Sequence, residues 1–147
     1  MIVETDCPFC EIVRRDTSGT REVYRDGRVV AFFPLNPATL GHILVVPLDH
    51  IPDIWSLDEE TAAHLARVTL RLSRAVKCAT DPEGLNIIQS NGAVATQTVP
   101  HLHTHIVPRW SGDEMGRIWP AQTSYSESQK DDVWKRLRHE CRKVGGE

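Results

Sequence analysis

The chain has 147 residues, of which 40% are hydrophobic and 25% are charged, and its formal net charge is −3. These values are typical of one globular domain with a single core, and the acidic balance gives no reason to expect a nucleic-acid partner. Neither an apolar run of ~18 residues, as a membrane span requires, nor a secretory signal is present. We therefore expect a cytoplasmic protein with no membrane partner, whose cysteines are thiols or metal ligands rather than disulfides.

The N-terminal segment contains a pair of cysteines at the spacing C-x-x-C, Cys7-Pro8-Phe9-Cys10, followed by a predicted short helix that continues to about Arg15. Such a pair serves as a redox centre, as half of a zinc site, or has no chemical role. A zinc site requires two further ligands from elsewhere in the chain. The pair alone leaves these three interpretations open.

Three strands are predicted next, over residues 21–25, 28–35 and 42–47. Asp26-Gly27 between the first two is a strong hairpin signal. The second and third strands are almost continuously apolar, which predicts burial on both faces, and prolines bound the loop that ends at Gly41. The pattern favours an antiparallel meander.

A long amphipathic helix is expected after Ser56-Leu57-Asp58-Glu59, which has the pattern of a capping box, and it should extend to about Ala79. A second side of this helix is basic, and a solvated face explains those arginines better than a phosphate site does. The apolar stripe consists of Leu65, Val68, Leu72 and Val76, and the basic side of Arg67, Arg71 and Arg74.

In the last part of the chain, the sequence predicts a fourth strand over residues 85–89 and a polar loop over residues 91–99. The motif His-Leu-His-Thr-His-Ile-Val-Pro-Arg follows at residues 101–109. The three histidines recur at the period of a strand, so their rings, that of His103 included, should line one exposed face while the alternate residues pack on a core. Pro108 is expected to end this strand because proline cannot donate to a ladder. A final helix is predicted from Ser128 through Cys141.

Three interpretations fit a row of three histidines. The first is a metal site, although histidines at period two seldom all reach one ion. The second is a polar strand face without chemistry, which is unfavoured because the whole chain has only seven histidines. The third is nucleophilic chemistry on phosphorus, in which one neutral imidazole attacks and its neighbours handle charge.

Residues 101–107 resemble the signature of the histidine triad nucleotide-binding family, in which histidines alternate with apolar residues; Thr104 replaces one apolar position. Gly41-His42-Ile43-Leu44-Val45-Val46-Pro47 resembles a second signature of that family. Asn91-Gly92 and Gln97-Thr98-Val99 resemble the segment that leads into the triad. The resemblance covers the chain from about Cys7 to Arg109.

The resemblance implies an α+β fold with an antiparallel sheet of about five strands, one long helix and a C-terminal helix. Residues 1–147 should form a single domain with a core at about 7–109 and an extension at about 110–147. Members of the family usually form homodimers, and a five-stranded sheet has two edges to protect.

The resemblance also implies a nucleotide substrate and cleavage at its α-phosphate. His103 would be the nucleophile and form a phosphohistidine, and His105 would contact the phosphoryl oxygens or protonate the leaving group. His42 would support the triad from a neighbouring strand, although a buried core histidine explains it as well. Dinucleoside polyphosphates, nucleoside phosphoramidates and adenylates are the substrate classes implied for a hydrolase or transferase. The alternative is a nucleotide-binding regulatory module with little turnover.

The polar positions Asn91, Gln97 and Thr98 match family positions that bind phosphate and leaving group. Thr96 stands where the family usually has glycine, and Pro34 stands where it often has the Asp or Asn that bonds the ribose. Asn36 is the candidate substitute for that residue. Arg109 is explained equally well by a contact with a distal phosphate and by a surface role.

The family often holds a zinc ion with two cysteines and two histidines, one before the long helix and one at the start of the triad. The matching positions here are Cys7, Cys10, His50 and His101. A structural zinc of this kind would attach the N-terminus to the triad segment.

Overall fold

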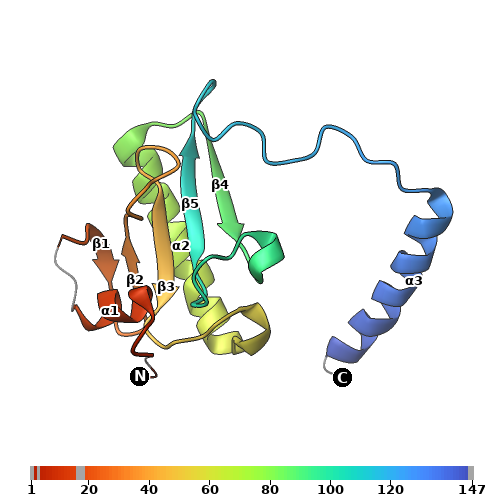
Figure 1. Ribbon diagram of the computed structural model, residues 1–147, viewed down its shortest axis with the longest axis horizontal. Coiled ribbons are helices and arrows are strands. Elements are labelled where there is room, and N and C mark those ends of the chain that lie inside the picture. Colours follow the sequence, from red (N-terminus) through yellow and green to blue (C-terminus); the bar gives the residue numbers. More distant parts are fainter. Residues whose placement is uncertain (1, 3, 16–18, 146–147) are drawn as a thin grey trace. The chain divides into compact units, whose positions relative to one another are not determined.

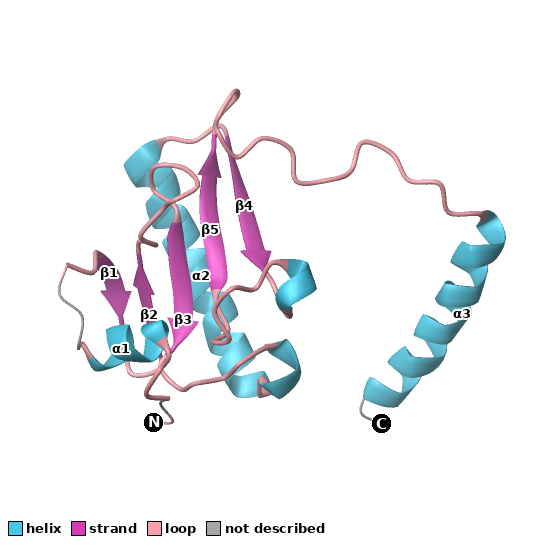
Figure 2. Cartoon of the chain, viewed as in Figure 1, coloured by secondary structure: helices cyan, strands magenta, loops and turns pink. Residues whose placement is uncertain are grey.

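The computed structural model describes residues 2, 4–15 and 19–145 and divides the chain into two compact units, residues 1–116 and 117–147. The first unit contains a five-stranded sheet with helices on its two faces (Figure 1 and Figure 2). The predicted α+β class is confirmed. Its strands are β1 (Glu22–Arg25), β2 (Val29–Phe32), β3 (Ile43–Pro47), β4 (Gly84–Gln89) and β5 (Thr104–Arg109); its helices are α1 (Pro8–Arg14) and α2 (Glu59–Thr80), with 3-10 turns η1 (Ile54–Ser56) and η2 (Ala93–Ala95).

The strand order is β1-β2-β3-β5-β4, and each neighbouring pair is antiparallel. The predicted meander forms the first three positions, and its hairpin is held by Asp26, whose Oδ1 accepts the backbone N–H groups of Arg28 at 2.8 Å and Val29 at 2.9 Å. This side chain supplies the turn with the hydrogen bonds that its backbone lacks. β5 lies between β3 and β4, so the strand that carries His105 lies inside the sheet, with β4 at the edge.

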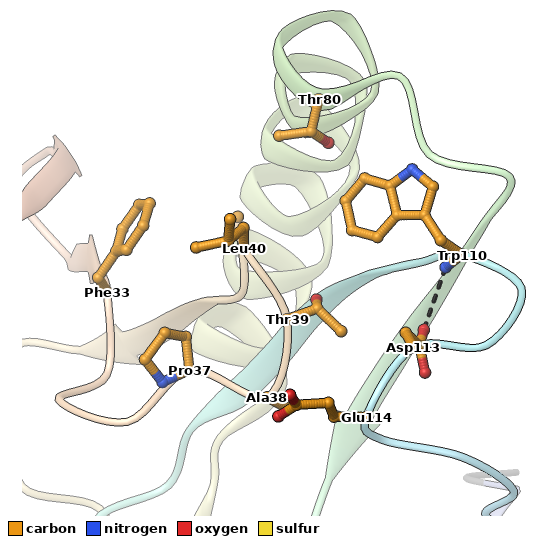
Figure 3. A pocket seen from close by; sticks show the side chains of 10 residues that line it. Phe33, Pro37, Ala38, Thr39, Leu40, Thr80, Trp110, Asp113 and Glu114 are labelled. Atoms are coloured by element: carbon orange, nitrogen blue, oxygen red, sulfur yellow. Dashed lines mark hydrogen bonds between the residues drawn. The ribbon is translucent and has the colours of Figure 1, made fainter.

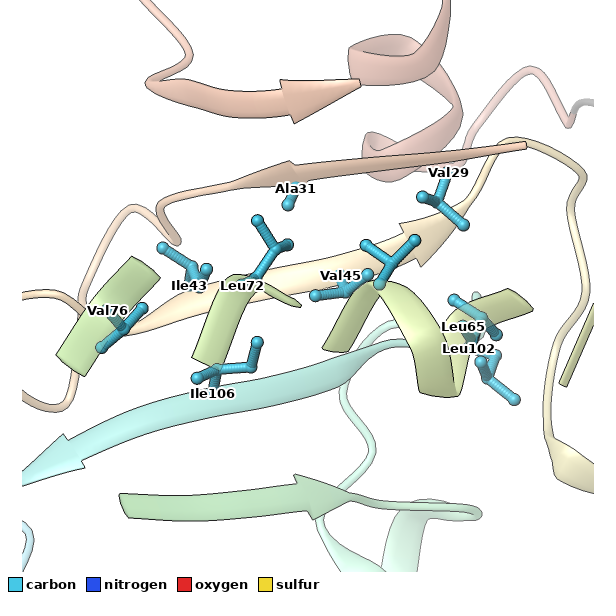
Figure 4. Close-up of a cluster of buried hydrophobic side chains, with 10 residues drawn as sticks. Val29, Ala31, Ile43, Val45, Leu65, Leu72, Val76, Leu102 and Ile106 are labelled. Atoms are coloured by element: carbon cyan, nitrogen blue, oxygen red, sulfur yellow. The ribbon is translucent and has the colours of Figure 1, made fainter. Parts of the chain in front are cut away.

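The sheet has a buried core on each face because β2 and β3 alternate their apolar side chains between the two. One face packs under α2, where the predicted stripe of the helix meets the sheet (Figure 4). The other face packs against α1 through Phe9 and Val13. The α2 cluster contains Val29, Ala31, Ile43, Val45, Leu65, Val68, Leu72, Val76, Leu102 and Ile106, and the α1 cluster contains Cys7, Phe9, Cys10, Val13, Val30, Phe32, Leu44 and Val46.

The start of α2 differs from the prediction of a capping box at Ser56. The N-cap is Asp58, whose Oδ1 accepts the backbone N–H of Thr61 at 2.8 Å and whose Oδ2 accepts the Thr61 hydroxyl at 2.7 Å. Ser56 instead ends η1. The Asp58 carboxylate accepts an N–H group of the first helical turn, as a serine hydroxyl would. Its negative charge also interacts favourably with the positive end of the helix dipole, so Asp58 takes the capping role.

β5 also differs from the prediction, because it begins at Thr104 and continues through Pro108 to Arg109. Of the three histidines, only His105 therefore lies within the strand. Proline is tolerated because the β3 ladder ends where Ile43 meets Ile106, and beyond it β5 pairs only with β4, through Leu85 opposite Pro108. Pro108 has no N–H to donate, but no β3 residue lies opposite it, so no backbone hydrogen bond between β5 and β3 is lost there.

The second unit contains α3 (Glu127–Val144), which begins two residues after Tyr125. Its N-terminus is a complete capping box, in which Ser126 and Gln129 bond each other's backbone N–H groups. No described residue of α3 is buried. In the described part of the chain, none of the helices has the length and apolarity that a bilayer crossing requires.

Candidate metal centre and histidine site

Four potential metal ligands from distant parts of the chain meet on the α1 face of the sheet. Cys7 and Cys10 enclose the first turn of α1, His50 follows β3, and His101 precedes β5. One donor atom from each residue lies within 4.8 Å of the others. The structure therefore brings together the four residues that the sequence suggested as metal ligands.

The spacing of these donors fits a tetrahedral zinc ion. His101 Nδ1 lies 3.5 Å from Cys7 Sγ and 3.6 Å from Cys10 Sγ, and His50 Nδ1 lies 3.4 Å from Cys10 Sγ. Tetrahedral bonds of about 2.3 Å to sulfur and about 2.0 Å to nitrogen separate the donors by about 3.5 Å. Thiolate and imidazole are also the donor types that zinc prefers.

Both histidines of the cluster present a lone pair toward its centre. His101 Nε2 donates to the carbonyl oxygen of Pro47 at 2.8 Å, and His50 Nε2 donates to Glu4 Oε2 at 2.8 Å, so Nδ1 is the unprotonated nitrogen in each ring. Burial lowers the pKa of His101 to about 4, which keeps the ring neutral at physiological pH. Burial also raises the pKa of the Cys10 thiol.

His103 is buried, with 5% of its surface exposed, and not on an exposed face as the sequence suggested. It packs edge-to-face on Phe9, with ring centroids 5.1 Å apart, because α1 covers this part of the sheet. Its Nδ1 donates to the carbonyl oxygen of His101 at 2.7 Å, which leaves a lone pair on Nε2. Burial lowers the pKa of His103, so the neutral, nucleophilic form is the stable one.

His42 and His105 form a directed chain of hydrogen bonds. The backbone N–H of Ala38 donates to His42 Nδ1 at 3.0 Å, so the proton of His42 is on Nε2, which donates to His105 Nδ1 at 2.9 Å. His105 must then carry its own proton on Nε2. Burial lowers the pKa of His42, and it lowers that of His105 to about 4. The ring centroids of His105 and His103 lie 4.9 Å apart, which places the N–H donor of His105 beside the unprotonated nitrogen of His103.

The polar loop between β4 and the triad is braced by two of its predicted site residues. Asn91 Oδ1 accepts the N–H of Ile54 at 2.7 Å, and Gln97 joins Gly92 to Pro52 through both ends of its amide. Thr98, by contrast, is exposed at the end of the loop. The structure therefore assigns Asn91 and Gln97 to holding the loop, with Thr98 at its surface.

Thr96 adopts the left-handed conformation at φ 71° and ψ 22°, which favours the glycine that the family usually has there. A β-branched residue in this region carries strain of roughly 1–2 kcal/mol. Its Oγ1 lies 3.4 Å from the hydroxyl of Ser90. The loop thus retains a glycine-like backbone despite the side chain.

The remaining sequence candidates lie on the surface or serve the fold. Asn36 is exposed, beside a half-buried Pro34. The guanidinium of Arg109 bonds both carboxylate oxygens of Asp113 at 2.7 and 2.9 Å and Asn86 Oδ1 at 2.8 Å. Arg109 therefore closes the turn after β5 in this structure, and its donors are already engaged.

An open, apolar pocket of about 820 Å³ lies beyond the C-terminal end of β5, where Trp110, Phe33 and Leu40 surround the end of α2 (Figure 3). None of the histidine side chains lines it. Gly41 closes its inner wall at φ +99°, where a Cβ would lie 2.9 Å from Thr80 Cγ2. The pocket therefore adjoins the histidine site at Ala38, whose N–H bonds His42.

Four groups that orient the histidines could not be identified from the sequence. They are the carboxylate of Glu4, the carbonyl oxygen of Pro47, the N–H of Ala38 and the ring of Phe9. Two of them are backbone groups, which any residue type supplies, so no sequence pattern marks them.

Comparisons with known proteins agree with this geometry. The family model of the HIT domain matches residues 16–112. "Protein hit" of Bacillus subtilis is 36% identical over 78% of this chain and 79% of its own length, and "Adenosine 5'-monophosphoramidase hnt1" of Schizosaccharomyces pombe is 31% identical over 78% and 84%.

Two solved structures have the same fold. A Streptococcus mutans protein superposes with a TM-score of 0.85 at 36% identity, covering 94% of this chain and 87% of that one. A zinc-bound histidine triad family protein from Mycobacterium smegmatis has a TM-score of 0.70 at 32% identity, covering 91% and 96%. With the family model spanning most of the first unit and its signature histidines gathered in one site, this chain belongs to the histidine triad, or HIT domain, family.

Proposed function

We propose that this protein is a nucleotidyl hydrolase or transferase that cleaves its substrate at the α-phosphate. The observation that carries the proposal is the hydrogen-bond chain that runs from Ala38 through His42 to His105. Beside it, His103 uses Nδ1 to bond a backbone carbonyl oxygen, which leaves the lone pair on Nε2 for attack. A nucleotide-binding module would not need a donor and a nucleophile oriented in this complementary way. The relative named as an adenosine 5'-monophosphoramidase supports nucleoside phosphoramidates as the substrate class to test first.

The reaction proceeds in two displacements. The Nε2 lone pair of His103 attacks the α-phosphorus and forms an N–P bond, while the bond to the leaving group breaks and its electron pair departs with that group. His105 donates its Nε2 hydrogen bond to the phosphoryl oxygens or the leaving atom, where charge develops. The oxygen of water, or of another acceptor in a transferase, then bonds the phosphorus and loses its proton, while the N–P bond breaks and its electron pair returns to Nε2 of His103.

We also propose that the protein holds a structural zinc ion, whose ligands are Cys7, Cys10, His50 and His101. All four positions are filled by protein ligands, so the ion supplies rigidity and no open coordination site. It would fix the segment whose carbonyl oxygen, at His101, orients the nucleophile.

A single-turnover experiment tests the covalent step. The protein is mixed in excess with an α-³²P-labelled adenosine phosphoramidate, quenched in alkali and digested. We expect label on the peptide that contains His103, with the lability to acid that distinguishes phosphohistidine. Complete turnover without labelled protein at any time point, including in rapid-quench measurements, would overturn the proposal.

The pH dependence of activity follows from the lowered pKa values of His42 and His105. Because burial stabilises the neutral rings, protonation that breaks the Ala38–His42–His105 chain occurs below the ordinary histidine range, at about 4 for His105. We expect kcat/KM to stay level from about pH 8 to about pH 6 and to fall only below about pH 5. Zinc content and circular dichroism at each pH provide the control, and an acid limb centred near about 6.5 in folded protein would contradict the expectation.

The sugar site gives a further expectation. Pro34 has neither a polar side chain nor an N–H to bond a ribose hydroxyl, and Asn36 is exposed. We expect ribo- and 2′-deoxyribonucleotide substrates to differ by roughly tenfold or less in kcat/KM, or about 1.4 kcal/mol. If the ratio exceeds about a hundredfold, another residue holds the ribose, and loss of the preference in Asn36→Ala would identify it.

We also propose that the protein is a homodimer formed through β4 and α2. β4 is an edge strand that exposes 37% of Leu85 and 49% of Ile87, and α2 beside it exposes 53% of Leu70. These side chains border an apolar groove of about 710 Å³. A second copy would cover both the groove and the unpaired strand edge.

Ile87→Lys tests this interface. We expect the wild-type chain, of 16.6 kDa, to elute as a dimer and the variant dimer to dissociate at a higher protein concentration than wild type, because a buried, unpaired lysine opposes the β4 contact. Val23→Lys is the matched control, since Val23 is also 49% exposed but lies on β1 at the opposite edge. Light scattering that shows a wild-type monomer at micromolar concentration would refute the dimer.

A further inference from the structure

The C-terminal helix presents an apolar face that no described residue of its own unit covers. Val133, Trp134 and Leu137 remain 45%, 53% and 58% exposed, and together with Tyr125 they border a groove of about 390 Å³ on the helix surface. Val133, Leu137, Cys141 and Val144 recur at spacings of three and four, the pattern of one helical seam. An 18-residue helix is marginal in water unless such a face is packed.

The charges of α3 are divided between its ends. The segment 127–132, its acidic half, carries three acidic residues and one lysine, and the segment 135–143, its basic half, carries five basic residues and one glutamate. The acidic set is Glu127, Asp131 and Asp132 with Lys130 among them, and the basic set is Lys135, Arg136, Arg138, Arg142 and Lys143 with Glu140 among them.

We propose that α3 pairs antiparallel with α3 of a second copy of this chain. Antiparallel packing places the acidic half of each helix against the basic half of the other, whereas parallel packing would place like charges together. When Val133 of one helix lies opposite Leu137 of the other, Lys130 lies opposite Glu140. The one lysine of the acidic half therefore also meets an opposite charge, the one glutamate of the basic half. The face is therefore self-complementary in charge, as a two-fold interface requires.

The same arrangement places the two Trp134 rings at the two-fold axis. Each indole already carries Arg138 over its face, with the guanidinium carbon 5.0 Å from the ring centroid. The edges of the two indoles that face the seam would be covered by the partner helix, while the guanidinium groups stay in solvent. The pairing thus needs no burial of the basic side chains.

Thiol cross-linking distinguishes the antiparallel pair from its alternatives. Antiparallel packing brings position 127 of one helix beside Cys141 of the other and separates the two Cys141 residues by roughly 20 Å along the axis. In full-length protein carrying Cys78→Ser, we expect Glu127→Cys to give a covalent dimer with a short bismaleimide. Lys135→Cys, on the opposite side of the helix, is the matched control and should remain uncross-linked.

A charge exchange provides the second measurement. Lys130→Glu should reduce the yield of the position 127 cross-link several-fold, and Lys130→Glu combined with Glu140→Lys should restore it, because the two residues face each other across the pair. The yield should be unchanged by Ile87→Lys, so failure of the β4 interface and failure of the helix pair are separable.

Three results would overturn the proposal. One is the absence of a cross-linked dimer from Glu127→Cys in folded protein at micromolar concentration. Another is efficient cross-linking of the unaltered Cys141 residues to each other, which would show parallel helices. The third is a cross-link yield from Glu127→Cys that Lys130→Glu leaves unchanged, which would show that Lys130 and Glu140 do not face each other.

Discussion

Replacement of His103 by alanine is expected to reduce kcat by at least about a thousandfold, which corresponds to about 4 kcal/mol of transition-state stabilisation. The substitution removes the nitrogen that would bond phosphorus, and neither His42 nor His105 can replace it, because their lone pairs at Nδ1 are already engaged. The measurement is kcat with an adenosine phosphoramidate, together with loss of the covalent label in single turnover.

His139→Ala is the matched control, since His139 lies on the exposed surface of α3. It should retain wild-type kcat. Because His103 is buried against Phe9, His103→Ala should also lower the melting temperature, and circular dichroism at the assay temperature shows that the variant is folded when its activity is measured. If His103→Ala kept more than about a tenth of wild-type kcat, equivalent to less than about 1.4 kcal/mol, His103 would not be the nucleophile.

Cys10→Ser is expected to release zinc and to lower the free energy of unfolding by more than about 3 kcal/mol. Cys10 has no exposed surface, and its sulfur lies within 3.6 Å of ligand atoms from both His50 and His101. A serine hydroxyl does not deprotonate to bind zinc as a thiolate does. Elemental analysis should show about one zinc per wild-type chain and almost none in the variant, with a melting temperature lower by roughly 10 °C.

The control is Cys78→Ser, because Cys78 is exposed on α2 and outside the cluster. It should keep both the metal and the melting temperature. A strong chelator should lower the melting temperature of wild type to that of Cys10→Ser and leave Cys10→Ser unchanged. Wild-type protein that contains no zinc when purified without chelator would refute the metal site.

Periodicity in the sequence was sufficient to predict the architecture of the first unit. The alternation of β2 and β3 and the stripe of α2 identify which side chains enter the core, since apolar area must be buried whatever the local detail. The errors lie at element ends. At Pro108 the strand continues because the neighbouring strand stops, which is a property of the sheet and not of residues near Pro108.

The site was predictable in its residue types and less so in their states. The spacing of the triad and its resemblance to the family placed His103 and His105 together, but the sequence suggested an exposed His103. Its burial depends on Phe9, which is separated from it by most of the first unit. The protonated nitrogen of each ring depends on partners such as Ala38 and Pro47, whose contribution is a backbone group and is therefore invisible to residue type.

The cluster of Cys7, Cys10, His50 and His101 also bears on how the chain is made. Cys10 and His101 are 91 positions apart, and the ribosome adds ~5–20 residues per second, so the two thiols precede their last partner by about 5–20 s during synthesis. Throughout that interval no site with all four ligands can form. An ion held by all four residues would therefore join the first turn of α1 to the segment before β5 only late in synthesis. Because β5 follows His101 in the chain and lies between β3 and β4, the four-ligand site and the complete sheet become possible at nearly the same point of synthesis.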